Sequence, residues 1–265
     1  MKLARMTGNL QKPFTKKIHN GLLMQLRLSD HIQRQIFWYG YYERDQVLCW
    51  ESFVIADAVV ADNGANAGYY SLVASAKAYA GSVFSFEPDQ RSVRQLKENI
   101  HLNKITNIHP IELAISSVTS EFPLYLAGSE NTGMTGLRKP DTFTGSTESV
   151  QVINLDEWVL LQGVERIDLI KMDIEGSEME ALKGMKEVLQ SFRPVLFVEI
   201  CQELLSRFDA RVEDIYTFLE GFSYQAYQII APHTIQRIQK PIEDELVLFL
   251  PKGYQIPPGI VLIKS

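Results

Sequence analysis

The chain has 265 residues, of which 46% are hydrophobic and 10% aromatic, and its formal net charge is −6. A chain of this length and composition can bury a sizeable core and is unlike a disordered protein. The negative charge disfavours nucleic acid as the main partner, because binding a phosphate backbone needs a basic surface. The two cysteines, Cys49 and Cys201, have neither disulfide nor zinc-site spacing, and we expect both to be buried thiols in a reducing compartment.

The first 50 residues (1–50) are expected to form a helical or irregular lead-in. They contain no apolar core typical of a signal peptide, and no apolar run in the chain approaches the ~20 residues that span a bilayer. We therefore expect a cytoplasmic protein without a transmembrane segment. The oligomeric state stays open, because the aromatic residues within 31–56 suit either a subunit interface or an internal contact.

From residue 58 onward, short apolar runs alternate with stretches of helical periodicity. Apolar strands that alternate with helices are typical of a parallel sheet. The pattern therefore predicts an α/β fold, a seven-stranded, mostly parallel sheet with helices on both faces. The predicted strands are 58–61, 82–86, 107–113, 167–172, 194–200, 222–230 and 245–250, and the predicted helices are about 68–80, 89–102, 177–189 and 212–219.

The interval 116–155 interrupts this alternation and is predicted to be an insertion. Strands at 122–126 and 149–153 flank a loop rich in Gly, Ser and Thr, residues 127–146, and a short helix follows at 155–161. Long loops inside compact domains are often functional. The loop is therefore our candidate for a substrate lid.

A loop with the sequence D-N-G-A-N-A-G follows the first predicted strand and leads into a helix. Gly64 and Gly68 let the chain turn sharply and let a ligand approach the main chain, and the helix N-terminus offers unpaired N–H groups. The spacing differs from the G-x-G-x-x-G of a dinucleotide site, and Asp62 would repel a phosphate. An acid at this position suits a ligand with an amino group, such as the methionine part of S-adenosylmethionine (AdoMet).

A second acid, Glu87, ends the next strand in the string F-E-P, roughly 20 residues beyond the glycine loop. An acid at that place can accept hydrogen bonds from both ribose hydroxyls of an adenosine. NAD and AdoMet both contain this group. Glu87 therefore predicts an adenosine-containing ligand without deciding which one.

Carboxylates also follow the fourth and fifth predicted strands: Asp173 and Glu175 in the string K-M-D-I-E-G-S-E, and Glu199 in F-V-E-I. Ligands of open α/β sheets bind beyond the carboxyl ends of the strands, so these groups should lie near one site. A hydroxyl nucleophile gains from a general base within hydrogen-bond reach. We predict Asp173 as that base, with Glu175 second and Glu199 a further candidate. A metal site that adds Glu178 is an alternative that we do not adopt, because such carboxylates are more often solvated or paired.

Seven strings between residues 62 and 200, with G-Y-Y-E (40–43) upstream, together match one known family over about residues 38–200. They are D-N-G-A-N-A-G-Y-Y-S (62–71), F-S-F-E-P-D (84–89), L-K-E-N-I-H-L-N (96–103), A-I-S (114–116), I-D-L-I-K-M-D-I-E-G-S-E (167–178), L-K-G (182–184) and F-V-E-I (197–200). By these strings the chain resembles the FkbM family of AdoMet-dependent methyltransferases. The resemblance implies a class I methyltransferase Rossmann-like fold, which we expect over residues 51–265, and AdoMet as the cofactor.

The resemblance also implies roles for individual residues. Asp62, Gly64, Asn66 and Gly68 of the glycine loop would hold the methionine end of AdoMet. Glu87 would bind the ribose, and Ala114 and Ile115 would contact the edge of the adenine. Asp173 would lie by the reacting centre. One residue departs from the family pattern, because Asn63 stands where family members usually carry an apolar side chain. An amide there must find partners or face solvent.

We predict in-line methyl transfer to a hydroxyl of a sugar, glycolipid or other natural product, with a small-molecule or carbohydrate acceptor. Two alternatives remain open. One is a catalytically silent AdoMet-fold binding module, for which Asn63 is the sole support. The other, with less support, is an NAD-dependent oxidoreductase, which would share Glu87 but lacks the phosphate-binding glycine pattern.

Overall fold

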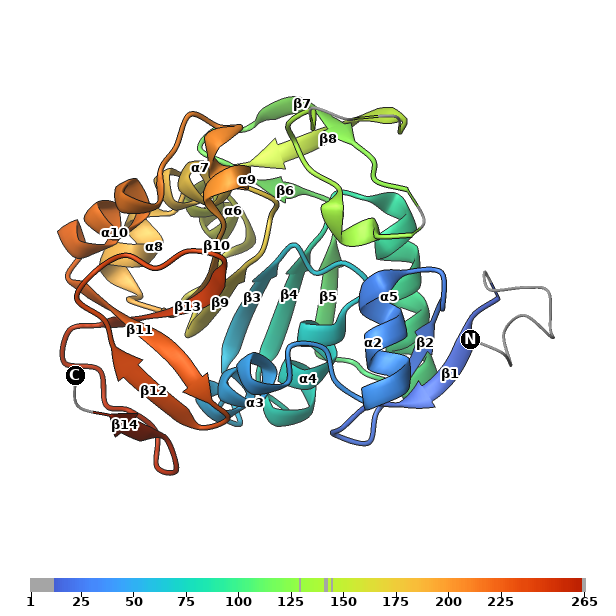
Figure 1. Ribbon diagram of the computed structural model, residues 1–265, viewed down its shortest axis with the longest axis horizontal. Coiled ribbons are helices and arrows are strands. Elements are labelled where there is room, and N and C mark those ends of the chain that lie inside the picture. Colours follow the sequence, from blue (N-terminus) through green and yellow to red (C-terminus); the bar gives the residue numbers. More distant parts are fainter. Residues whose placement is uncertain (1–11, 129, 141–142, 144, 264–265) are drawn as a thin grey trace.

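The computed structural model describes residues 12–263 except 129, 141, 142 and 144. Its centre is a nine-stranded sheet in the order β14-β12-β11-β13-β10-β9-β3-β4-β5 (Figure 1). The strands are β3 (Val59–Asn63), β4 (Ser82–Phe86), β5 (Ile108–Ile111), β9 (Leu169–Met172), β10 (Val195–Ile200), β11 (Tyr224–Ala231), β12 (Thr234–Arg237), β13 (Glu245–Pro251) and β14 (Val261–Ile263).

Seven neighbouring strands, from β5 to β11, form the predicted mostly parallel sheet. Strands β5, β4, β3, β9 and β10 run parallel, and β13 pairs antiparallel with both β10 and β11. The α/β class I methyltransferase fold expected from the sequence is therefore confirmed. The sheet extends beyond the prediction, because β12 and β14 add two short strands next to β11.

Helices cover both faces of the sheet, and the alternation of each strand directs its side chains to two separate cores. In β3, for example, Val60 packs into one core and Ala61 into the other. The first core is covered by α3 (Arg44–Phe53), α4 (Tyr69–Lys77) and α5 (Gln90–Asn103), and the second by α6 (Leu155–Gln162), α7 (Glu178–Lys183), α8 (Lys186–Ser191) and α10 (Val212–Gly221). Helix α5 begins as predicted at Asp89, whose side chain accepts the N–H of Arg91.

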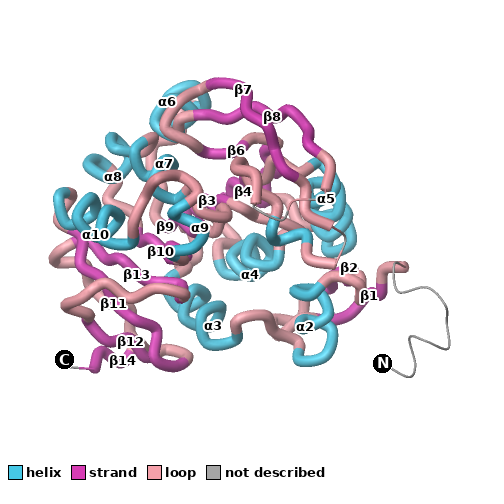
Figure 2. Tube along the Cα trace, turned by 45° about the horizontal axis from the view of Figure 1, so that its top comes forward, coloured by secondary structure: helices cyan, strands magenta, loops and turns pink. Residues whose placement is uncertain are grey.

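Before the sheet, the N-terminal segment folds as a hairpin followed by two helices. Strands β1 (Phe14–Lys17) and β2 (Leu23–Leu26) pair antiparallel, α2 (His31–Tyr39) follows, and α3 crosses the predicted domain boundary at residue 50. The segment lies beside α5 and α4 (Figures 1 and 2), where the Asn99 and Asn103 side chains of α5 bond to the β2 backbone. It thus includes a hairpin that the sequence pattern does not predict, and it is packed on the sheet domain.

The predicted insertion forms a small sheet of its own above the ends of the central strands (Figure 1). Strand β8 (Thr147–Ile153) pairs with β6 (Ala114–Ile115) and β7 (Ser120–Tyr125), and the loop between β7 and β8 contains a 3₁₀ turn, η1 (Thr132–Met134). Both predicted strands of the insertion are therefore present. Four residues of the candidate lid, 129, 141, 142 and 144, lie outside the described residues.

Two expectations are corrected by the structure. The single helix predicted at 177–189 is divided into α7 and α8, because the main chain leaves helical geometry at Gly184 (φ −87°, ψ 6°) and Met185 (φ −134°, ψ 31°). Gly184 lies against the insertion there, since a Cβ on it would be 2.0 Å from the main-chain oxygen of Ser116. Cys49 is buried, but Cys201 is partly exposed, since it precedes the short helix α9 (Gln202–Ser206) at the end of β10. No helix in the described part of the chain has the length and apolar character to cross a membrane.

The departure from the family pattern at Asn63 has an energetic consequence. Its side chain is fully buried at the end of β3, and neither Oδ1 nor Nδ2 has a hydrogen-bond partner among the described residues. A buried, unpaired amide costs about 1–3 kcal/mol. We therefore expect Asn63→Val to raise the free energy of unfolding by about 1–3 kcal/mol, measured by urea denaturation.

A matched control for Asn63→Val is Asn107→Val. The Asn107 Nδ2 donates to the main-chain oxygens of Ser75 and Ala78 at 3.2 and 2.7 Å, so its loss should lower the free energy of unfolding. If Asn63→Val lowers the free energy of unfolding as Asn107→Val does, the buried amide of Asn63 has partners in the folded protein.

Candidate active site

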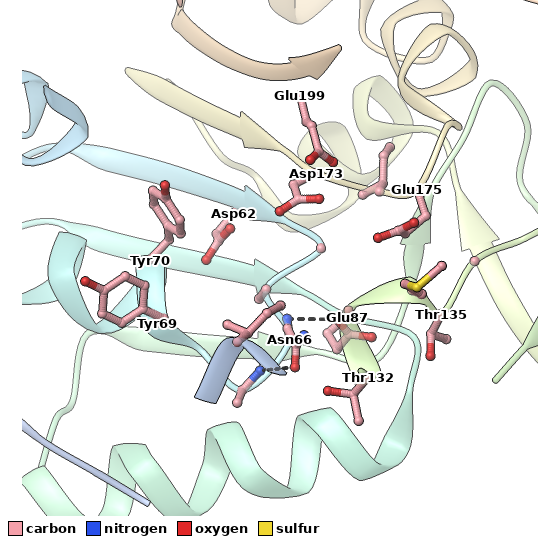
Figure 3. Close-up of a pocket in the computed structure, with 18 of the residues that line it drawn as sticks. Asp62, Asn66, Tyr69, Tyr70, Glu87, Thr132, Thr135, Asp173, Glu175 and Glu199 are labelled. Atoms are coloured by element: carbon pink, nitrogen blue, oxygen red, sulfur yellow. Dashed lines mark hydrogen bonds between the residues drawn. The ribbon is translucent and has the colours of Figure 1, made fainter. Parts of the chain in front are cut away.

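A pocket opens where the carboxyl ends of β3, β4, β9 and β10 meet (Figure 3). Residues far apart in the sequence line it: the glycine loop, the end of β4, the turn after β9, the end of β10, β6 and η1 of the insertion, and α2 from the N-terminal segment. All but one of the predicted site residues line this pocket: Asp62, Gly64, Asn66, Glu87, Ala114, Ile115, Asp173, Glu175 and Glu199. The exception is Gly68, which begins α4 just beyond it.

The glycine loop is folded tightly against the turn after β9. Gly64 has a φ of 82°, and a Cβ on it would lie 1.9 Å from the main-chain oxygen of Asp173. The Asp173 N–H donates in turn to the main-chain oxygen of Asn63 at 3.2 Å. Only a residue without a side chain permits this approach, so Gly64 brings the two predicted parts of the site together.

Asp62 and Glu87 are buried acids at the two ends of the glycine loop. One carboxylate oxygen of Asp62 accepts the Ser71 hydroxyl at 2.5 Å, and the other has no partner among the described residues. The Glu87 carboxylate accepts the N–H groups of Asn66 and Asp89, each at 2.8 Å. Burial raises the pKa of Glu87 to about 7 and also raises the pKa of Asp62.

The carboxylates after β9 and β10 form a pair around a buried lysine. Lys171 is 2% exposed, and its Nζ lies 2.9 Å from Asp173 Oδ2 and 4.6 Å from the centre of the Tyr70 ring. Figure 3 shows the Asp173 and Glu199 side chains directed toward one another, and the two carboxyl groups share a hydrogen bond.

The two acids of this pair have opposite pKa shifts. Burial raises the pKa of Asp173, but the Lys171 ammonium and the hydrogen bond from Glu199 outweigh it and hold this pKa below its usual value. The charge on Asp173, followed by burial, raises the pKa of Glu199 well above its usual value. Within the pair, Asp173 is therefore the more acidic member, and Glu199 is the one that more readily keeps a proton.

Glu175 lies in the turn after β9 with a φ of 56°, a left-handed conformation that is unusual for a side chain other than glycine. Burial, with the Asp173 charge second, raises its pKa to about 8. Glu178 has a different position, because its carboxylate accepts the N–H groups of Ile174 and Gly176 within its own turn. In the described part of the chain, no group of three or more His, Cys, Asp or Glu side chains is arranged to hold a metal ion.

The insertion closes over the pocket through one buried acid. Asp30 is 1% exposed and caps α2 by accepting the Gln33 N–H, and its second oxygen accepts the N–H and the hydroxyl of Thr132 in η1 at 2.9 and 2.8 Å. The N–H of His31 donates to the main-chain oxygen of Glu130. The candidate lid is thus bonded to the N-terminal segment across the pocket.

The sequence analysis gave no role in the site to four polar residues near the reacting edge: Tyr42, Glu43, Tyr70 and Lys171. Tyr42, Tyr70 and Lys171 line the pocket, and Glu43 bonds to Tyr70 directly behind it. One of them had a visible signal, because a lysine in the otherwise apolar strand I-D-L-I-K-M must be buried and paired. The others come from segments whose position relative to the sheet is set by tertiary packing alone.

Comparison with known proteins assigns the family. Residues 62–227, more than half of the chain, match the model of the methyltransferase FkbM domain. The chain belongs to the FkbM methyltransferase family. The resemblance found in the sequence is therefore confirmed: residues 62–227 form a methyltransferase FkbM domain, and the family points to AdoMet as the cofactor.

The chain shares about a third or less of its aligned residues with two curated relatives. The chain is 34% identical over 147 residues to the hexuronic acid methyltransferase AglP of Haloferax volcanii, covering 54% of this chain and 56% of AglP. It is 27% identical over 161 residues to the 2-O-methyltransferase NoeI of Sinorhizobium fredii, covering 56% of this chain and 65% of NoeI. The matches thus span less than two thirds of each relative.

Among solved structures, an FkbM methyltransferase from Methylobacillus flagellatus has a TM-score of 0.49 to this chain at 18% identity, covering 74% of this chain and 44% of that protein.

Proposed function

We propose that this chain is an AdoMet-dependent O-methyltransferase that acts on a hydroxyl group of a sugar, glycolipid or other natural product. The observation that carries the proposal is the position of the Asp173 carboxyl group at the pocket wall beside the glycine loop, with its Oδ2 2.9 Å from the Lys171 ammonium. The names of two relatives, a hexuronic acid methyltransferase and a 2-O-methyltransferase, support a carbohydrate hydroxyl as the acceptor.

The residues present fit the cofactor. The oxygen of Asp62 that has no partner among the described residues is a buried acceptor for the methionine ammonium, and Gly64 and Asn66 of the glycine loop line the pocket beside it. We assign the methionine end to Asp62, Gly64, Asn66 and Gly68, the ribose hydroxyls to Glu87, and the edge of the adenine to Ala114 and Ile115. When bound, AdoMet would supply a methyl group on a sulfonium centre. An incoming oxygen would bond to this methyl carbon in line, and the sulfur would leave as a neutral thioether.

In the proposed mechanism the acceptor hydroxyl hydrogen-bonds to Asp173. As its oxygen bonds to the methyl carbon and the carbon–sulfur bond breaks, the hydroxyl proton passes to the Asp173 carboxylate. Glu199 stays protonated and donates to Asp173, and Lys171 keeps that acid ionised before the reaction. Positioning by the pocket walls supplies much of the remaining acceleration. Glu175 is the second candidate for the base.

The assignment of Glu87 to the ribose predicts a pH dependence of binding. At neutral pH its carboxyl group is partly protonated, because burial raises its pKa to about 7. A carboxylate that accepts two hydroxyls must be ionised, so binding favours loss of the proton. The affinity for 5′-methylthioadenosine, which has ribose and adenine but no amino group, should rise up to tenfold per unit below about pH 7 and level off above. Calorimetric titrations between about pH 5.5 and 8 measure this.

The control for this pH dependence is Glu87→Gln. The amide cannot ionise, so binding should be weaker at high pH and nearly independent of pH. A slope that persists in Glu87→Gln would assign the titrating group to another residue.

The proposed function is tested with AdoMet labelled in its methyl group. The purified protein is incubated with the cofactor and a panel of neutral sugars, hexuronic acids, glycolipids and polyketides, and mass spectrometry detects the methylated product. A product labelled on oxygen supports the proposal. S-adenosylhomocysteine binding without transfer to any acceptor would instead favour a catalytically silent module, and binding of NAD alone would favour an oxidoreductase.

For the silent module, Asn63 gives no support in the structure. Its side chain is not among the residues that line the pocket, and it points away from Asp62, its neighbour in the strand. No feature of the site favours the oxidoreductase.

A further inference from the structure

Two consecutive residues of the N-terminal segment, Tyr42 and Glu43, reach the reacting edge from the turn between α2 and α3. Tyr42 lines the pocket together with Asp173 and Glu199. The Glu43 carboxylate accepts the Tyr70 hydroxyl at 2.9 Å, and its charge, second to burial, contributes to the raised pKa of the Tyr42 hydroxyl. One carboxylate thus holds the Tyr70 phenol and acts electrostatically on the Tyr42 phenol.

The main chain at Glu43 is in an unfavourable conformation. Its φ of 46° and ψ of 60° are left-handed, which costs energy for any residue with a side chain. Glu43 is the N-cap residue of α3, yet its side chain makes no capping hydrogen bond. Capping therefore does not explain the acid, and the strain coincides with the direction of its side chain toward the pocket.

A continuous chain of contacts connects Glu43 to the proposed base. Glu43 accepts the hydroxyl of Tyr70, and the ring of Tyr70 lies 4.6 Å from the ammonium of Lys171. The same ammonium lies 2.9 Å from Asp173, which is hydrogen-bonded to Glu199. A phenol that donates to a carboxylate has a more electron-rich ring, which strengthens its attraction for a cation.

The charged groups along this series of contacts also act on one another. Glu43 faces Tyr42 and Tyr70, and it interacts with the charges of Lys171 and Asp173. Lys171 in turn also interacts with Asp62, and Asp173 with Glu199. Because Glu43 and Asp173 carry like charges, an ionised Glu43 makes Asp173 hold a proton more tightly and so act as a stronger base.

We propose that Glu43 is a positioning residue for methyl transfer, which orients Asp173 through Tyr70 and Lys171 and raises the basicity of Asp173 by its own negative charge. This rests on the proposed function, in which Asp173 is the base. The N-terminal segment is then a working part of the catalytic site.

The test compares Glu43→Gln, Tyr70→Phe and their combination. Glu43→Gln should lower kcat about tenfold with the KM for AdoMet changed less than about threefold, because orientation is lost and cofactor contacts are kept. It should also move the acidic limb of the kcat/KM profile to lower pH, since a negative charge near the base is removed. Tyr70→Phe should lower kcat in the same way but shift the acidic limb less, because it keeps the Glu43 charge. The double variant should be no worse than the more impaired single one.

The matched control is Asp45→Asn. Asp45 lies in the first turn of the same helix, 44% exposed and paired with Arg44, so its substitution removes the same charge away from the pocket. It should leave kcat and the pH profile unchanged. If Glu43→Gln behaves like Asp45→Asn, or if both lower only the melting temperature, Glu43 has a structural role and the proposal is wrong.

A second readout does not need an acceptor. In protein saturated with S-adenosylhomocysteine, carbon-13 NMR of the Asp and Glu carboxyl groups follows the titration of the Asp173–Glu199 pair. Glu43→Gln should lower the apparent pKa of this pair relative to wild type, Asp45→Asn and Tyr70→Phe, and an unchanged titration would overturn the coupling. If wild type methylates no acceptor but the pair's pKa shifts, the proposed function fails while the coupling stands.

Discussion

Replacing Asp173 by asparagine is expected to lower kcat for methyl transfer by about 10²- to 10⁴-fold. The amide keeps the shape of the carboxylate and can still accept from Lys171, but it cannot take the acceptor's proton. Since we assign the cofactor contacts to the glycine loop and Glu87, the affinity for S-adenosylhomocysteine should change little. Initial rates with saturating AdoMet, together with calorimetry of S-adenosylhomocysteine, measure the two effects separately.

Glu199→Gln is the matched control for Asp173→Asn. Because Glu199 holds the proton of the pair, a glutamine has the same neutral state and can still donate to Asp173. Its kcat should stay within about tenfold of wild type. If Glu199→Gln or Glu175→Gln abolishes transfer while Asp173→Asn remains active, the base is assigned to the wrong carboxylate.

The sheet could be predicted because its strands are apolar throughout and its helices have a clear period. The strand 82–86 is predicted with the bounds that the structure has, and β3 and β10 are each found within two residues. Elements that were missed are short and half-polar: β1, with the sequence F-T-K-K, and β12, with T-I-Q-R, alternate exposed with more buried positions over four residues. Four residues give too few positions to separate a strand from a loop.

The site could be predicted as far as it depends on the ends of parallel strands. Asp62, Glu87, Asp173 and Glu199 each follow or end a strand, and topology alone brings those ends to one edge. Tyr42 could not be found this way, since it precedes the sheet and reaches the pocket only through the packing of α2 and α3.

The electrostatic roles within the site also lie beyond sequence reasoning. The sequence favours Asp173 over Glu199 as the base, but the electrostatic roles of the two acids separate only because Lys171 lies beside Asp173. That ammonium is fixed by side chains from α4 and β9 together, including the Tyr70 ring. A pKa difference between two acids depends on distances of a few ångströms, which no spacing in the chain determines.

Gly64→Ala is expected to have the largest effect of any single methyl group added to this protein. The new Cβ would lie 1.9 Å from the main-chain oxygen of Asp173 and 2.9 Å from its carbonyl carbon. Main-chain atoms of a turn between β9 and α7 cannot move aside as a flexible side chain can. Overpacking and the left-handed φ of 82° together should lower the free energy of unfolding by about 3 kcal/mol or more. Urea denaturation measures the loss.

Gly163→Ala separates the two causes of that loss. Gly163 ends α6 with a φ of 65°, and a Cβ there meets no atom within 4 Å, so alanine adds backbone strain without a clash. Its cost should be about 1 kcal/mol. The larger loss of unfolding free energy for Gly64→Ala then measures the clash between the glycine loop and the turn after β9. The affinity for S-adenosylhomocysteine should fall in the same variant. Equal costs for the two variants would mean that the loop does not pack on Asp173, and cofactor and base would then lack their common support.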